Sequence, residues 1–240
     1  MYLTIGHRGA KGHYRENSLR SIRIAKEFGC EIIEIDVRRS KDGHFFLQHD
    51  EAVKMFDFTT GEVQITRIED ENFERIRQSG IEQLLPAIMH ITDKANVYLD
   101  LKIEDNENVK RYADDLIENL KEFEEIGHKF FLASFNKKLM DYLSKKYYDK
   151  KYLYGLILDE NEELTKKEIQ SQFYYFYVFN YNSKNLKEFA KQICKENKFV
   201  FLYTLNIIEE MRGLENRGIK FHGIVSDFPD RVKLFCKSFR

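Results

Sequence analysis

Several features that would place the chain in a special class are scarce or missing. Its 240 residues contain only three cysteines, Cys30, Cys194 and Cys236, which are widely spaced and form no Cys-x-x-Cys pair. An odd, scattered set of this kind indicates reduced thiols in a reducing compartment. No apolar run approaches the ~20 residues of a membrane span, and the N-terminal stretch MYLTIGHRG directly enters a strand-like segment. We therefore expect a cytoplasmic protein without a signal peptide or stable membrane insertion.

An excess of charge of one sign is also missing. The 39 Lys and Arg residues nearly balance the 40 Asp and Glu residues, which gives no electrostatic argument for binding nucleic acid or an anionic membrane. The hydrophobic content of 42% and aromatic content of 14% do not indicate disorder. Without a linker or low-complexity tract, residues 1–240 are expected to form a single domain with no large insertion. The oligomeric state is not indicated by these features.

Short apolar runs alternate with longer amphipathic runs along the chain. Strands are predicted at 2–6, 31–37, 97–102, 129–134, 152–158, 174–179, 199–204 and 222–226. Helices are predicted between them, at 17–28, 69–79, 84–94, 107–126, 136–147, 161–171, 183–196 and 207–217. Repeated alternation of strand and helix indicates a parallel sheet. Eight such strands in this length predict a (β/α)8 TIM barrel; a doubly wound open sheet is the rival fold, but no glycine-rich phosphate loop follows the first strand.

One strand-like segment, 44–49, interrupts the alternation. It follows 31–37 too closely for a crossover helix, so the pair is predicted to form an antiparallel hairpin. Asp42-Gly43 is typical of a two-residue type I′ turn. With that turn, Lys41 pairs with His44 and His49 lies directly opposite Asp36.

Carboxylates occur where apolar strands are expected. In EIIEIDV (31–37), Glu34 and Asp36 lie two residues apart and share one strand face, while isoleucine and valine occupy the other. Asp100 and Lys102 share a face of the next barrel strand in the same way. Buried carboxylates are costly unless they are paired or bind a metal. The pattern therefore indicates either a hard divalent cation, Mg²⁺ or Ca²⁺, or internal salt bridges such as Asp100–Lys102 with an arginine.

Two histidines end predicted strands near these acids. His7 is followed by Arg8-Gly9, and His49 is followed by Asp50. Histidine can both take and give a proton near neutral pH, and the planar fork of Arg8 suits a phosphate.

The segments HRGAKGHYRENS and EIIEIDVRRSKDGHFFLQHD resemble the pattern HRG…PEN[ST]…E-x-D-V…KDG…HD of the glycerophosphodiester phosphodiesterase family. Further along, LLPAI, YLDLK, ASFN, YTLN and GIVSDFPD are similar to the family segments iPtL, E-x-K, SSFN, WTVN and GIITDxP. The resemblance touches nearly the whole chain in the family order.

The resemblance implies a metal-dependent barrel enzyme that hydrolyses a small glycerophosphodiester to glycerol 3-phosphate and an alcohol. It implies acid–base roles for two histidines, phosphate contacts for two cations, three carboxylate ligands for one Mg²⁺ or Ca²⁺, and two supporting residues in the first loop. In this sequence the two histidines are His7 and His49, and the two cations are Arg8 and Lys102. The three carboxylate ligands are Glu34, Asp36 and Asp100, and the two supporting residues are Glu16 and Asn17. In such enzymes the 2-hydroxyl of the glycerol is thought to attack phosphorus, and water then opens the cyclic phosphate. Phe135 and Tyr203 are expected to contact the substrate. For Phe135, simple packing is an equally strong alternative.

The chain departs from the family pattern at several places. Asp100 replaces a glutamate, which shortens the third ligand by one methylene, and Arg15 replaces the proline before Glu16. Tyr203 replaces a tryptophan, so an aromatic wall is kept with an added hydroxyl. The segment between Asp50 and residue 97 is short, which predicts an open mouth.

Two other functions remain open at this point. One is a lysophospholipase D or sphingomyelinase D type of activity on a lipid. It would need an apolar mouth or a membrane-seeking surface, and no basic amphipathic helix is evident. The other is a non-catalytic barrel that binds a phosphodiester, against which the presence of both histidines, Arg8 and Lys102 argues.

Overall fold

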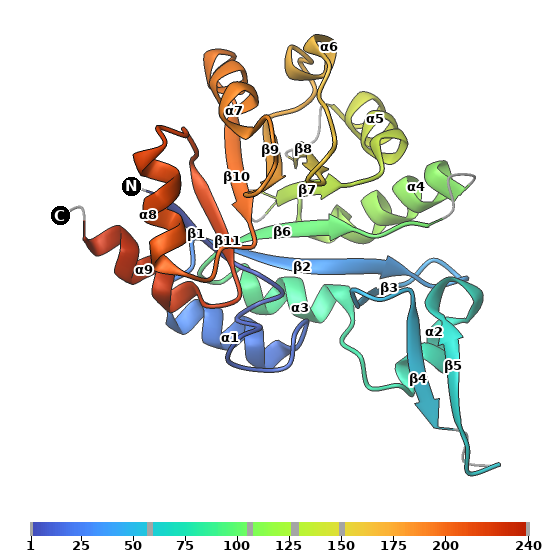
Figure 1. Cartoon of the computed structure of the whole chain (residues 1–240). Helices are drawn as coiled ribbons and strands as arrows, with labels where there is room; N and C mark the ends of the chain where they lie inside the picture. Colours follow the sequence, from blue (N-terminus) through green and yellow to red (C-terminus); the bar gives the residue numbers. More distant parts are fainter. Residues whose placement is uncertain (1, 57–59, 105–107, 126–129, 149–151, 239–240) are drawn as a thin grey trace.

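The computed structural model describes residues 2–56, 60–104, 108–125, 130–148 and 152–238. Eight parallel strands close into a barrel in the order β1-β11-β10-β9-β8-β7-β6-β2, and β1 pairs with β2 to complete the ring (Figure 1). These strands are β1 (Leu3–Gly6), β2 (Ile32–Arg39), β6 (Asn96–Leu101), β7 (Phe130–Ser134), β8 (Tyr152–Leu158), β9 (Phe176–Asn180), β10 (Phe199–Tyr203) and β11 (Gly223–Ser226). The predicted (β/α)8 barrel and all eight of its strands are confirmed.

Most helices cover the outside of the barrel, whereas α2 (Phe73–Arg77) lies beside a projecting hairpin (Figure 1). The helices are α1 (Leu19–Glu27), α2, α3 (Leu84–Ile91), α4 (Val109–Leu120), α5 (Lys137–Lys146), α6 (Lys166–Ile169), α7 (Leu186–Lys195), α8 (Ile208–Asn216) and α9 (Pro229–Lys237), with short 3-10 turns η1 (Ile68–Asp70) and η3 (Lys121–Phe123). Helix α9 was not predicted. Within the described residues, no helix is long and apolar enough to cross a bilayer.

The alternation along β2 separates two apolar cores. Ile33, Ile35 and Val37 belong to the core between the barrel and its helices, whereas Ile32 faces the interior of the barrel. The interior is filled by side chains from every barrel strand, namely Ile5, Ile32, Tyr98, Phe131, Ala133, Ile157, Phe176, Val178, Phe201 and Val225. Because side chains alternate along a strand, Glu34 and Asp36 share the inward face with Ile32, further toward the carboxyl end of β2.

The predicted hairpin exists, but its predicted register is wrong. Strand β3 (Phe45–Leu47) pairs antiparallel with β2, with Val37 opposite Leu47. The turn contains three residues because Gly43 N–H donates to Ser40 O (3.1 Å) and Gly43 takes a φ of +92°, as in a type I turn followed by a left-handed residue. The Ser40 hydroxyl also accepts from the backbone N–H of His44 (3.0 Å), which closes the longer loop.

The extra loop residue shifts every partner by one. Gln48 N–H therefore donates to Asp36 O (3.3 Å), and His49 does not lie opposite Asp36. Strand β3 ends at Leu47, and the chain bends at His49 and Asp50.

A second hairpin follows, which was not predicted. Strands β4 (Ala52–Phe56) and β5 (Val63–Arg67) pair antiparallel in a separate two-stranded sheet. They project away from the barrel beside β3 and α2 (Figure 1). A small apolar core joins this hairpin to the barrel through Phe46, Val53, Met55, Ile68 and Ile76.

Candidate active site

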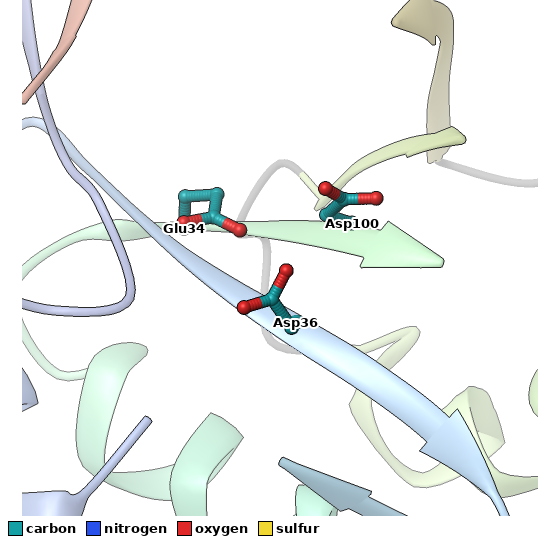
Figure 2. A group of neighbouring side chains, drawn as sticks. All are labelled: Glu34, Asp36 and Asp100. Atoms are coloured by element: carbon teal, nitrogen blue, oxygen red, sulfur yellow. The ribbon is translucent and has the colours of Figure 1, made fainter. Parts of the chain in front are cut away.

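Three carboxylates converge inside the barrel near the carboxyl ends of two neighbouring strands. Glu34 and Asp36 come from β2 and Asp100 comes from β6, where Asp36 and Asp100 are register partners. Their exposed fractions are 3%, 1% and 8%. One oxygen from each lies within 4.8 Å of the others, and Figure 2 shows the three groups turned toward a common space. Such an all-oxygen set suits a hard divalent cation.

The three carboxylates could carry more negative charge than the neighbouring cations balance. Burial raises the pKa of Glu34 well above its ordinary value, and Asp36 and Asp100 raise it further. Burial also raises the pKa of Asp100, although Lys102 acts against it. In addition, Asp100 Oδ1 is buried and has no hydrogen-bond partner among the residues that the structure describes. An unpartnered anionic oxygen beside two more carboxylates fits a cation ligand.

Two cations reach the same cluster. Lys102 Nζ lies 2.6 Å from Asp100 Oδ2 and 3.1 Å from Asp36 Oδ1, and Arg8 Nε lies 2.9 Å from Asp36 Oδ2. The internal salt bridges that the sequence left open are therefore formed. Burial acts to lower the pKa of Lys102, but Asp100 and Asp36 raise it to about 12, so the side chain is a permanent cation. Within the described part of the chain, these pairs leave Glu34 and one oxygen of Asp100 without a side-chain ion pair.

The loop after β1 also hydrogen-bonds to the carboxylate cluster. Arg8 (φ +50°) and Asn17 (φ +53°) both adopt the left-handed conformation, which is uncommon outside glycine and concentrates at functional sites. The backbone N–H of Arg8 donates to Glu34 Oε2 (2.7 Å). Asn17 Nδ2 donates to Asp36 Oδ2 (2.9 Å), and the N–H of Asp36 donates back to Asn17 Oδ1 (3.1 Å). The helix cap is Ser18, which leaves Asn17 to hold Asp36.

Glu16 acts on the same loop through Arg8. Its two carboxylate oxygens accept from Arg8 Nη1 at 3.0 and 2.9 Å, and Lys11 Nζ lies 3.1 Å from Oε2. The guanidinium of Arg8 is thus held between Glu16 and Asp36. Burial acts to lower the pKa of Arg8, but Asp36, Glu34 and Glu16 raise it.

His7 is oriented by a residue that the sequence analysis did not assign. His7 Nδ1 lies 2.6 Å from Asp227 Oδ1, and Asn206 Nδ2 donates to Asp227 Oδ2 (2.8 Å). A carboxylate accepts, so Nδ1 carries the proton and Nε2 of the neutral ring is free to take one. Burial would raise the pKa of Asp227, but the hydrogen bonds from His7 and Asn206 lower it. The segments GIVSDFPD and YTLN contain both residues, but nothing in their spacing links them to His7.

His49 reaches the site from the bend after β3. Its ring is 42% exposed, and Nδ1 lies 3.0 Å from Oδ1 of the neighbouring Asp50. The bend, rather than the predicted pairing with Asp36, brings His49 to the same cavity as His7.

One cavity of about 140 Å³ joins these groups. Its lining includes His7, Arg8, Glu34, His49, Asp100, Lys102, Phe135 and Tyr203, together with Tyr98 from the interior core of the barrel. Phe135 and Tyr203 form an edge-to-face pair with ring centroids 6.2 Å apart, and Lys102 Nζ lies 5.4 Å from the Phe135 ring. The added hydroxyl of Tyr203 donates to Leu158 O (2.9 Å), so the ring remains as an aromatic wall. Every residue predicted for the site thus lies at this cavity or holds a residue that does.

The charge of the segment RRSK (38–41) predicts a solvated face or a turn, but for its two arginines this prediction is wrong. The side chains of Arg38 and Arg39 are each only 10% exposed. Arg39 pairs with Asp115 on α4, whereas Arg38 points toward the His49 segment.

The family model described as the glycerophosphoryl diester phosphodiesterase family matches residues 7–231. The chain belongs to this family. Within the family, the glycerophosphodiester phosphodiesterase of Caldanaerobacter subterraneus is 26% identical over 248 residues, covering 96% of each chain. That of Bacillus altitudinis is 22% identical over 245 residues, covering 94% of each chain.

Solved structures with the same fold include family members of low sequence identity. An Oleispira antarctica phosphodiesterase in complex with the product sn-glycerol-3-phosphate has a TM-score of 0.83 at 20% identity, covering 98% of this chain and 96% of that one. The glycerophosphodiester phosphodiesterase of Thermotoga maritima has a TM-score of 0.74 at 23% identity, covering 99% of both. These similarities show that this chain has the barrel of the family.

Proposed function

We propose that the protein hydrolyses a small glycerophosphodiester to glycerol 3-phosphate and an alcohol, using one Mg²⁺ or Ca²⁺ and the acid–base pair His7 and His49. The observation that carries the proposal is the shared cavity: two histidines, two cations and two of the three clustered carboxylates line about 140 Å³. The complex of the Oleispira antarctica relative with sn-glycerol-3-phosphate supports the product class.

The carboxylate cluster is the proposed cation site. Glu34, Asp36 and Asp100 would hold the ion, with Asp100 contributing Oδ1, for which the described residues provide no hydrogen-bond partner. The bound cation would supply Lewis-acid stabilisation of the negative charge that develops on the phosphoryl oxygens. Asp100 is one methylene shorter than the glutamate of the family pattern. Lys102 pairs with its Oδ2, so Oδ1 is the oxygen that would contact the ion.

The remaining steps belong to residues of the chain. Arg8 and Lys102 bring fixed positive charge to the phosphate and stabilise the transition state electrostatically. One histidine accepts the proton of the glycerol 2-hydroxyl as its oxygen bonds to phosphorus, and the other protonates the departing alcohol oxygen. The two histidines exchange roles when water opens the cyclic phosphate. Attack from within the substrate avoids the entropy cost of bringing in a second reactant.

The size of the cavity favours a compact substrate. Pockets for drug-sized ligands usually measure ~300–1,000 Å³, whereas this cavity measures about 140 Å³. It suits a glycerol phosphate better than a lipid chain, and Phe135 and Tyr203 would face the glycerol. The lipid-directed alternatives find no specific support in this cavity.

The test is release of glycerol 3-phosphate from glycerophosphodiesters with choline, ethanolamine, glycerol, sugar and nucleotide leaving groups, with and without chelator. We expect excess chelator to abolish release, and Mg²⁺ or Ca²⁺ to restore it. His7→Ala and His49→Ala should each lower kcat at least ~100-fold, as loss of a general acid or base does. His90→Ala is the control, because among the described residues the His90 ring hydrogen-bonds only to Pro86 O within α3. Full activity in chelator would refute the metal requirement, and wild-type rates in both histidine variants would refute the acid–base pair.

A further inference from the structure

Arg38 continues the inward-facing series of β2. Glu34, Asp36 and Arg38 alternate with Ile35 and Val37, so all three lie on the same strand face. The Arg38 side chain is 10% exposed. A buried guanidinium two residues beyond the acidic cluster needs a structural or functional partner.

The partner is the backbone of His49. Arg38 Nε and Nη2 both donate to the carbonyl oxygen of His49, at 2.8 and 2.6 Å. Nη2 also donates to Glu104 Oε1 (3.1 Å) after β6. The planar fork of arginine can make this two-armed contact on one oxygen, and a single ammonium cannot.

The two histidines of the cavity are held in different ways. His7 is held through its ring, because Asp227 binds Nδ1 and Asn206 holds Asp227. Among the described residues, the only side chain that hydrogen-bonds the His49 ring is Asp50, which is 77% exposed on its side chain. An exposed neighbour places few restraints on a ring in a bend of the chain. The contact with Arg38 therefore provides the buried restraint on His49.

We propose that Arg38 is a positioning residue that sets the place of His49 by clamping its carbonyl oxygen. The inference rests on the proposed role of His49 in proton transfer. A displacement of about 1 Å at a reacting group can cost ~100-fold in rate. Loss of the two hydrogen bonds from Arg38 to His49 O should therefore lower kcat more than it weakens substrate binding.

The chain offers a matched control in the next residue. Arg39 lies on the opposite face of β2, is equally buried, and donates through Nε to Asp115 Oδ2 (2.7 Å). We expect Arg38→Met to lower kcat about 30- to 100-fold with KM changed less than about threefold. Arg39→Met should keep kcat within about twofold of wild type. Arg38→Lys, which keeps the charge but has no fork, should lose about tenfold and serves if the methionine variant does not fold.

A second measurement separates positioning from general destabilisation. Ring signals of His49 in ¹³C-histidine-labelled protein are assigned by their absence in His49→Ala. We expect Arg38→Met or Arg38→Lys to shift and broaden the His49 signals while those of His7 stay in place, and Arg39→Met to change neither.

Wild-type kcat in the Arg38 variants, or unchanged His49 signals with a lowered kcat, would overturn the positioning role. The same holds if Arg39→Met loses as much kcat as Arg38→Met. These results are distinct from a failure of the proposed function, which would appear as wild-type activity in His49→Ala itself.

Discussion

Glu34 is buried beside two other carboxylates, and this raises its pKa well above the ordinary value of glutamate. A group whose folded-state pKa is raised binds more protons in the native than in the unfolded state, so stability falls as pH rises above the unfolded pKa of ~4.3. In excess chelator, we expect wild-type protein to lose free energy of unfolding as the pH rises above the unfolded-state pKa, and Glu34→Gln to lose less. Urea unfolding at several pH values measures this difference. Identical slopes for the two proteins would contradict the prediction.

Lys102 bridges Asp100 and Asp36 at 2.6 and 3.1 Å, and its side chain is only 12% exposed. Removing one member of a buried ion pair leaves charge uncompensated and typically costs ~3–5 kcal/mol. We expect Lys102→Met, measured by urea unfolding in chelator, to lose free energy of unfolding in that range. Lys137→Met is the control, because the Lys137–Glu162 pair (2.9 Å) is about one-third exposed and such pairs contribute ~0–1 kcal/mol. Equal losses in the two variants would show that the central pair is not energetically special.

At the scale of elements, the β2–β3 turn depends on a glycine. Gly43 has a φ of +92°, and a Cβ there would lie 3.0 Å from Asp115 Oδ2. Gly80 has a φ of +73° but open space around it, so it bears only the backbone cost of a side chain. We expect Gly43→Ala to lose ~1–3 kcal/mol of stability and more than Gly80→Ala, as measured by urea unfolding. Gly43→Ala should also lower kcat, because the turn sets the course of the chain to His49.

If Gly80→Ala proved as damaging to kcat as Gly43→Ala, the turn would have no special link to the site. If neither variant changed stability, the left-handed conformation would carry no cost here.

The elements themselves were predictable to different degrees. Short apolar runs identified the barrel strands, because such strands are buried on both faces and are therefore nearly continuously apolar. The turn length was not predictable from Asp42-Gly43, since the Ser40 hydroxyl and the left-handed Gly43 select a three-residue loop. Strands β4 and β5 were missed. Along β5, Val63 and Ile65 do alternate with Gln64 and Thr66, but the strand is almost wholly exposed, so this alternation does not mark a buried face.

For the whole molecule, a bound cation should stabilise the closed barrel. A ligand that binds only the folded state at 100 times its Kd adds ~2.7 kcal/mol, and about 1 kcal/mol shifts Tm by ~2–4 °C in a domain of this size. We therefore expect saturating Mg²⁺ or Ca²⁺ to raise Tm by about 5–10 °C, measured by calorimetry against protein in chelator. Asp100→Asn should show a smaller rise, because it removes the charge of one proposed ligand. No shift with either ion would contradict a cation site in the acidic cluster.

Much of the site was predictable because its residues cluster in motifs near strand ends, where parallel barrels gather functional groups. Asp227 was not predictable in this way, because its partner His7 lies 220 residues away along the chain. Arg38 was missed for a different reason. Its charge suggested solvent, whereas its position on the inward face of β2 places its fork on a backbone oxygen.

The bond between His7 and Asp227 has a consequence for biosynthesis. His7 is translated before most of the barrel, but the carboxylate that orients it belongs to the loop after the last barrel strand. A nascent chain that stops before β11 would already contain both histidines, all three acids of the cluster, Arg8 and Lys102, yet the ring of His7 would lack the carboxylate that fixes its tautomer. Translation therefore completes this set of contacts only after the last barrel strand has been made.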